Sequence, residues 1–116
     1  MIDDKTMEHI IWATEAEMKA AIEKHGEFNS HHEAWAVLRE EVQEMQECSE
    51  RFSCVDVAMN GLWNRIRKNI VSDNVEQLDI DNIYDVAKGM ALEAVQVMAV
   101  CKKWLKLIDE EREEDE

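Results

Sequence analysis

Apolar side chains recur every three or four residues through most of this chain. This spacing places them along one face of an α-helix, so the pattern predicts helices. Four segments carry it, and the expected helices span about residues 5–24, 30–49, 55–71 and 79–110. In the second of these segments the apolar positions are Ala34, Trp35, Leu38, Val42 and Met45.

Residues typical of helix ends lie at the predicted boundaries. Gly26 follows the first helix, where a glycine favours termination. Ser30 opens a capping-box pattern ahead of the second helix. The polar segment 72–77 is predicted to be a loop, and the last helix is expected to begin at Asp79 or Asp81.

Composition favours helices as well. The 116 residues include no proline and only three glycines, the main helix breakers. Apolar residues make up 46% of the chain and charged residues 34%. This balance suits a folded amphipathic bundle rather than a disordered chain. We therefore predict an all-α protein, a four-helix bundle that is oligomeric because so short a chain builds only a small core.

The chain is strongly acidic, with a formal net charge of -14. Residues 109–116 contribute seven acids and one arginine, and 111–116 are predicted to form a disordered acidic tail after a single helical domain, 1–110. An acidic body repels phosphate backbones, so nucleic acid is an unexpected partner. A basic stretch in the third helix, at Arg65, Arg67 and Lys68, is either a solvated face or a phosphate contact across a subunit boundary.

The sequence predicts a cytoplasmic protein with no membrane contact. No apolar run approaches the roughly 20 residues that span a bilayer. The three cysteines, Cys48, Cys54 and Cys101, form no C-x-x-C pair and are expected to be free thiols. The histidines show no H-E-x-x-H pattern, which argues against a zinc enzyme.

Acidic residues gather on one flank of the second helix. With about 100° per residue and Leu38 at the centre of the apolar stripe, Glu41 falls about 60° away at the core border. Glu44 falls about 120° away on the same side, with Glu40 close to it. Carboxylates this close repel one another, and a bound magnesium ion would remove the repulsion. A solvated acidic face is the alternative interpretation.

The last helix carries two isolated polar residues in an apolar stretch, Glu93 and Gln96. They lie three positions apart and so occupy neighbouring turns of one side. A carboxylate among apolar residues needs a partner, which a metal ion or a hydrogen bond between the pair would supply. Two helices that each offer oxygen ligands favour the metal interpretation.

These residues resemble the all-α nucleotide pyrophosphohydrolases, the MazG-like group that includes dimeric dUTPases. Their E-x-x-E motif on one helix corresponds to Glu41 and Glu44, and their later E-x-x-D motif corresponds to Glu93 and Gln96. The chain is most similar to small phage and prophage members, in the segments His32–Glu41 and Glu93–Val100.

The resemblance implies an enzyme that converts a nucleoside triphosphate into a monophosphate and pyrophosphate, in nucleotide-pool housekeeping or phage nucleotide metabolism. It implies magnesium, with manganese as a possible substitute, and a homodimer or homotetramer. The catalytic residues implied are Glu41 and Glu44, and the metal ligands Glu40, Glu41, Glu44, Glu93 and Gln96. Lys103 is expected to contact a phosphate, and Trp35 either stacks on a base or belongs to the core.

The chain departs from the family pattern at Gln96, where the family has aspartate. A neutral amide binds magnesium more weakly than a carboxylate. Two alternatives to the enzyme therefore stay open: a non-catalytic descendant of the fold that binds or regulates, and a helical oligomer that serves as an interaction protein.

Overall fold

The computed structural model describes residues 3–68 and 73–115, and all of its regular structure there is helical. In chain order the helices are α1 (Asp4–His25), α2 (His31–Glu50), α3 (Phe52–Arg67) and α4 (Asp73–Asp115). The all-α prediction is confirmed. No helix in the described part of the chain combines the length and the apolar character needed to cross a membrane.

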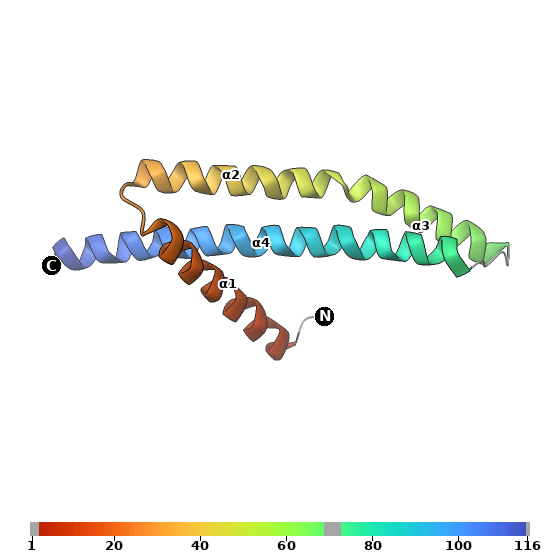
Figure 1. The fold of residues 1–116 in the computed structure, drawn as a ribbon, viewed down its shortest axis with the longest axis horizontal. Coiled ribbons are helices and arrows are strands. Elements are labelled where there is room, and N and C mark those ends of the chain that lie inside the picture. Colours follow the sequence, from red (N-terminus) through yellow and green to blue (C-terminus); the bar gives the residue numbers. More distant parts are fainter. Residues whose placement is uncertain (1–2, 69–72, 116) are drawn as a thin grey trace.

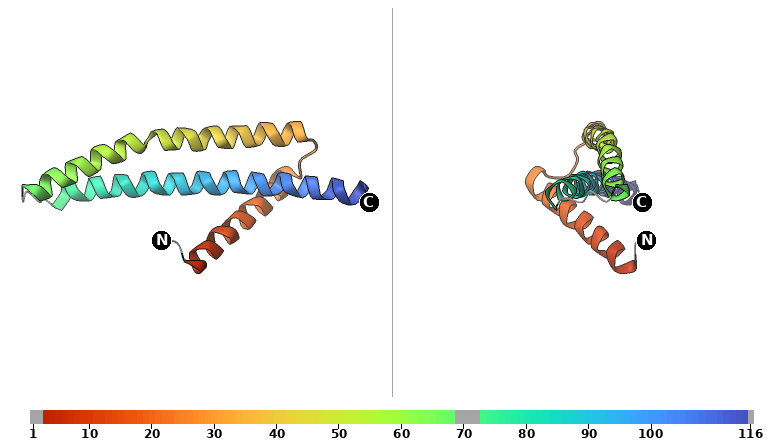
Figure 2. Two further views of the ribbon diagram at one scale, coloured as in Figure 1. Left: turned by 180° about the vertical axis from the view of Figure 1, so that it is seen from behind. Right: turned by 90° about the vertical axis from the view of Figure 1, so that its right-hand side faces the viewer.

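The bundle is open and elongated. Helices α2 and α3 follow one another end to end and run beside α4, while α1 crosses α4 obliquely (Figure 1). The view from behind and the end-on view show the same arrangement (Figure 2). Within the described residues, α4 contacts the other three helices, whereas α1 packs on α4 alone. The molecule measures 69 × 29 × 22 Å.

Local capping fixes the first two helices as predicted. The Gly26 backbone has a φ of 76°, in the left-handed region that favours glycine. Its N–H donates a 2.7 Å hydrogen bond to the carbonyl of Ile22. The Ser30 hydroxyl accepts the backbone N–H of Glu33 at 3.1 Å, as an N-cap does. The Glu33 carboxylate does not complete a capping box, since it accepts from the side-chain amide of Asn29 instead.

The later boundaries differ from the prediction. Helix α3 begins at Phe52, only one residue after α2 ends, and its predicted end at 71 lies outside the described residues. Helix α4 begins at Asp73, so residues 73–77 of the predicted loop are helical, while position 72 lies outside the described residues. Neither Asp79 nor Asp81 is an N-cap. The physical reason is tertiary: α4 packs against α3, and Asp79 pairs with Arg65 of that helix.

The acidic C-terminal segment is helical through Asp115, where the prediction ended the helix near 110. Two contacts explain the extension. Glu111 lies 2.8 Å from a ring nitrogen of His31 in α2, and Glu110 lies 3.8 Å from the Lys106 ammonium one turn earlier. These contacts offset part of the repulsion among the acids.

The core is small and lies mainly along α4, where α1 and α2 each pack against it. The buried apolar residues among those described are Phe28, Ala34, Ala58 and Ala99. Two polar residues, Thr14 and Lys103, are buried with them. Thr14 is satisfied by a 2.8 Å hydrogen bond from its hydroxyl to the Ile10 carbonyl. Ion pairs from Lys102 to Glu15 and from Lys106 to Glu27 tie α4 to α1 and to the following connection.

Candidate metal centre and adjoining pocket

Three carboxylates from two helices converge. Glu41 and Glu44 lie three residues apart on α2, and Glu93 lies on the facing side of α4. Each offers one oxygen, and the three oxygens lie within 4.8 Å of one another. We call Glu41, Glu44 and Glu93 the carboxylate triad.

Glu41 is turned inward further than the sequence indicated. Ala34 is fully buried, which marks the side of α2 that faces α4. At about 100° per residue, Glu41 lies only about 20° from Ala34, so it belongs to the middle of that face. The sequence analysis placed Leu38 at the centre of the apolar stripe, but Leu38 is only half-buried, so the centre of the buried face lies closer to Ala34.

The three carboxylates of the triad repel one another, and a positive charge between them would relieve this repulsion. Burial raises the pKa of Glu41 above its usual value, and the neighbouring charges of Glu44, Glu93 and Glu40 raise that pKa further. One oxygen of Glu93, Oε2, is buried and accepts no hydrogen bond. In the described part of the chain no lysine forms an ion pair with the triad.

The donor set fits a hard divalent cation. Carboxylate oxygens are the ligands that magnesium and manganese prefer in proteins. The unpartnered Oε2 of Glu93 would gain a partner on binding such an ion, and the raised pKa of Glu41 would fall. The remaining predicted ligands lie beside the triad: Glu40 is exposed on α2, and Gln96 is half-buried one turn after Glu93.

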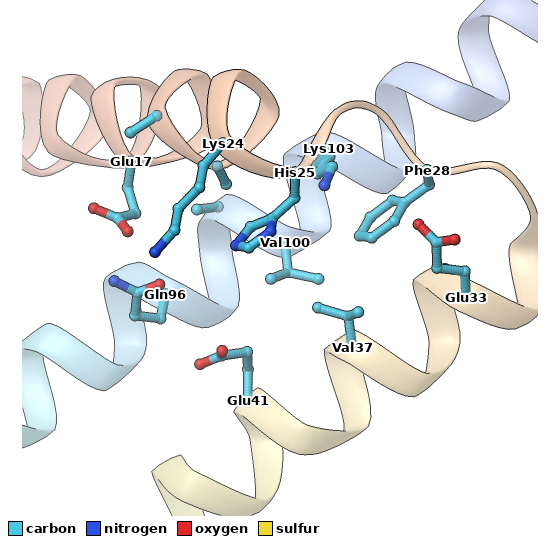
Figure 3. Close-up of a pocket in the computed structure, with 13 residues that line it drawn as sticks. Glu17, Lys24, His25, Phe28, Glu33, Val37, Glu41, Gln96, Val100 and Lys103 are labelled. Atoms are coloured by element: carbon cyan, nitrogen blue, oxygen red, sulfur yellow. The ribbon is translucent and has the colours of Figure 1, made fainter.

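A pocket of about 530 Å³ adjoins the triad, between α1, α2 and α4. Glu41 lines the pocket and is also a member of the triad, so the two features are continuous. Figure 3 shows Gln96 and Glu41 on facing helices at one side, with Phe28 and Lys103 toward the other. The full lining is Glu17, Ala20, Ala21, Lys24, His25, Phe28, Glu33, Val37, Glu41, Gln96, Ala99, Val100 and Lys103.

Lys103 is a buried cation on the wall of this pocket, which also carries Lys24 and three glutamates, Glu17, Glu33 and Glu41. The residue is only 8% exposed, and its ammonium nitrogen lies 4.1 Å from the centre of the Phe28 ring. Among the described residues it forms no ion pair with a carboxylate. A buried ammonium without an anionic partner is costly, so its place on the pocket wall indicates an anionic ligand.

Most of the pocket lining was not predicted from the sequence, including its basic and aromatic residues Lys24, His25 and Phe28. Lys24 and His25 end α1, and Phe28 lies in the connection to α2. Phe28 did carry a signal: a single aromatic residue between two helices in a polar connection is expected to be buried. Lys24 and His25 carried no such signal in the sequence, because only the crossing angle of α1 brings them to the pocket.

Trp35 is not a core residue of the described chain, and its stacking on a base stays a prediction. It is 57% exposed, so its assignment to the core is wrong. It does not line the pocket, and its ring packs against Arg39, whose guanidinium carbon lies 5.8 Å from the ring centre. Stacking of Trp35 on a base therefore gains no support from the described structure.

Together the fold and the site define a class of protein: an all-α protein with a candidate divalent-cation centre beside a pocket that is lined by both lysine and glutamate side chains. Comparisons of the chain with protein-family models, with curated proteins and with solved structures found no match.

Proposed function

We propose that the protein is a magnesium-dependent nucleoside triphosphate pyrophosphohydrolase, which produces a monophosphate and pyrophosphate. One observation carries the proposal. The carboxylate triad opens onto a pocket whose wall holds the buried, unpaired ammonium of Lys103. A cation centre beside a buried lysine is the arrangement that a polyphosphate ligand requires.

Each charged group has a defined part in this proposal. Glu41, Glu44 and Glu93 hold the cation, and Glu40 adds negative charge beside them. When bound, magnesium would lower the pKa of a coordinated water and neutralise charge on the phosphoryl oxygens. Lys103 contacts a phosphate oxygen and holds the chain of phosphates in the pocket.

The pocket suits a nucleotide in size. Its volume is about 530 Å³. This value lies inside the range of roughly 300–1,000 Å³ that holds small ligands and cofactors. Lys24 and His25 add polar groups to the wall, and Ala20, Ala21 and Ala99 keep part of it apolar. The wall also carries three carboxylates, of Glu17, Glu33 and Glu41, so the phosphates of a nucleotide would be held by the bound cation together with the lysines.

The alternative is a non-catalytic module that binds nucleotide without turnover. Gln96 favours this alternative, because a neutral amide stands where the resembling family has an acid. Gln96 lies on the pocket wall, where the substitution would matter. Both functions share the same ligand and the same cation.

The test is an assay of the purified protein with ribo- and deoxyribonucleoside triphosphates in the presence of magnesium or manganese. Monophosphate and pyrophosphate should appear together and disappear with EDTA. Glu41→Gln and Glu93→Gln should abolish turnover and cation binding, while Glu47→Gln, an exposed acid on α2, should preserve both.

The outcomes separate the alternatives. Nucleotide binding without products in the wild type supports the non-catalytic module. Unchanged cation affinity in both triad variants contradicts either function. We further propose that the protein acts in the cytoplasm on the nucleotide pool of a cell or phage, and that it is a homo-oligomer.

A further inference from the structure

Glu17 of α1 is a pocket acid that the proposed function has not used. Of the other two acids in the pocket lining, Glu41 belongs to the carboxylate triad and Glu33 accepts a hydrogen bond from the side-chain amide of Asn29. Glu17 is half-buried, and within the described structure its carboxylate forms no hydrogen bond and no ion pair. An ionised carboxylate only accepts hydrogen bonds, so Glu17 offers the pocket an unused acceptor.

Glu17 lies at the end of the pocket that is nearer to the triad. Figure 3 shows its carboxylate on the side of Gln96 and Glu41, whereas Phe28 and Lys103 lie toward the other end. Gln96 and Lys103 are seven residues apart, which corresponds to about 10 Å along α4. The acceptor of Glu17 and the buried ammonium of Lys103 therefore lie at opposite ends of one pocket.

These charges orient a bound nucleotide, if the function proposed above is correct. The phosphates extend from a cation held by Glu41 toward Lys103, because both attract phosphate oxygens. The nucleoside then lies at the opposite end, beside Glu17. A carboxylate at that end repels phosphate but accepts hydrogen bonds from neutral hydroxyl groups. The neighbouring 2′ and 3′ hydroxyls of ribose are donors of this kind, and carboxylates bind ribose hydroxyls in dinucleotide-binding folds.

The described lining of the pocket offers little aromatic surface to a base. Phe28 is only 5% exposed, and the ammonium of Lys103 lies 4.1 Å from the centre of its ring. The other ring in the lining is the imidazole of His25, an exposed residue at the end of α1. Stacking on aromatic side chains is a common way to hold a base, and neither ring provides a buried face for it. Selection among nucleotides therefore falls on the sugar.

We propose that Glu17 is a specificity-determining residue that selects ribonucleotides, by accepting hydrogen bonds from the 2′ and 3′ hydroxyls of the sugar. The inference rests on the proposed function, and it applies equally to an enzyme and to a protein that binds nucleotide without turnover. Each hydrogen bond to a charged acceptor contributes about tenfold in affinity. The expected order of affinity is ribonucleotide, 2′-deoxyribonucleotide, 2′,3′-dideoxyribonucleotide.

The experiment is calorimetric titration of the full chain, with magnesium, against α,β-imido analogues of these three kinds of triphosphate. The imido group resists hydrolysis, and the analogues are used in both an adenosine and a uridine series. The wild type should bind the ribose analogues about tenfold more tightly than the deoxyribose ones and roughly a hundredfold more tightly than the dideoxyribose ones. Glu17→Met should bind all three with nearly equal affinity.

The matched control is Glu23→Met, at an exposed position of α1 outside the pocket, which should keep the selectivity of the wild type. Circular dichroism of both variants verifies that they remain helical. Titration with manganese alone tests whether Glu17 is a ligand of the cation instead. Glu17→Met should bind the ion as the wild type does, and a weakened affinity contradicts the proposal.

The remaining outcomes separate this inference from the function on which it rests. Equal binding of all three sugars by the wild type overturns the inference and leaves the proposed function intact. Sugar selectivity that persists in Glu17→Met also overturns it. If Glu17→Met loses affinity for the adenosine series alone, the carboxylate binds the amino group of the base, and its assignment to the sugar is wrong. If the wild type binds none of the analogues, the proposed function fails and this inference fails with it.

Discussion

The ammonium nitrogen of Lys103 lies 4.1 Å from the centre of the Phe28 ring, and both residues are buried at the edge of the same pocket. Phe28 follows α1 and Lys103 belongs to the second half of α4, so this contact forms only when the two helices cross. The aromatic face attracts the ammonium but does not neutralise it, which keeps the positive charge available to a ligand.

Replacing Lys103 with methionine should separate ligand binding from stability. The substitution removes a buried ammonium that has no anionic partner, so the free energy of unfolding should stay constant or rise by about 1 kcal/mol. Nucleotide binding should weaken at least tenfold, a loss of about 1.4 kcal/mol. Calorimetric titration with a nucleoside triphosphate measures the affinity, and chemical denaturation measures the stability.

The control for this prediction is Lys19→Met, at an exposed position of α1 outside the pocket. It removes the same charge and should leave the affinity unchanged. If Lys103→Met binds nucleotide as tightly as the wild type, then Lys103 does not contact the ligand.

The carboxylate triad predicts how stability depends on pH. The pKa of Glu41 is raised in the folded protein by burial and by the charges of Glu44 and Glu93. The folded state therefore holds this proton more tightly than the unfolded state, and stability falls as pH rises through the folded pKa. In EDTA, the melting temperature of the wild type should decrease as pH rises from about 4.5, the ordinary value, through that pKa.

Glu41→Gln should remove this part of the pH dependence and raise the melting temperature at pH 7, because it removes a repelled, half-buried charge. Glu47→Gln should have neither effect. Magnesium should raise the melting temperature of the wild type at pH 7 but not that of Glu41→Gln. Equal stabilisation of both proteins by magnesium is the result that counts against the metal centre.

A third prediction concerns Gln96, which shares the pocket wall with Glu41. Gln96→Asp adds a carboxylate one turn from Glu93, so magnesium affinity should rise roughly tenfold. If the wild type binds nucleotide without turnover, this variant is the one expected to gain activity. Titration with manganese, followed by electron paramagnetic resonance, measures free and bound ion directly. An unchanged affinity shows that position 96 lies beyond reach of the cation.

The sequence predicted the parts of this structure that depend on short-range order. Gly26 and Ser30 end and begin helices through contacts within four residues, and these boundaries were confirmed. The proximity of Glu41 and Glu44 followed from their spacing on one helix. The position of Glu93 beside them was also expected, because Glu93 is an isolated acid in an apolar stretch. The distance from its carboxylate to those of Glu41 and Glu44 could not be predicted from the sequence.

The remaining features depend on tertiary contacts that periodicity does not encode. The early start of α4 depends on its packing against α3 and on the pairing of Asp79 with Arg65. Trp35 belongs to the apolar stripe of α2 but lies at the exposed edge of that stripe. The spacing of apolar residues alone does not distinguish the edge of a stripe from its buried centre. Lys24 and His25 reach the pocket through the crossing of α1 over α4, which is set by side-chain packing along both helices.

A final prediction concerns the hydrogen bonds that connect His31 to the end of α4. The indole N–H of Trp104 lies 2.9 Å from Nδ1 of His31, and Nε2 of His31 lies 2.8 Å from a carboxylate oxygen of Glu111. An indole nitrogen can only donate, so Nδ1 must accept and be unprotonated in this arrangement. The N–H at Nε2 then donates to Glu111, and the ring links α2 to the acidic segment.

His31→Ala breaks both bonds and should cost about 1 kcal/mol of stability. The loss should be local, because Glu111 is then left among like charges with one partner fewer. Hydrogen exchange should therefore quicken at backbone amides 108–115 and stay unchanged in the first half of α4. His32→Ala, at the exposed neighbouring position, should leave exchange at the C-terminal segment as it is in the wild type. Slow exchange at 108–115 in the His31 variant would show that the acidic end of α4 is held by other contacts.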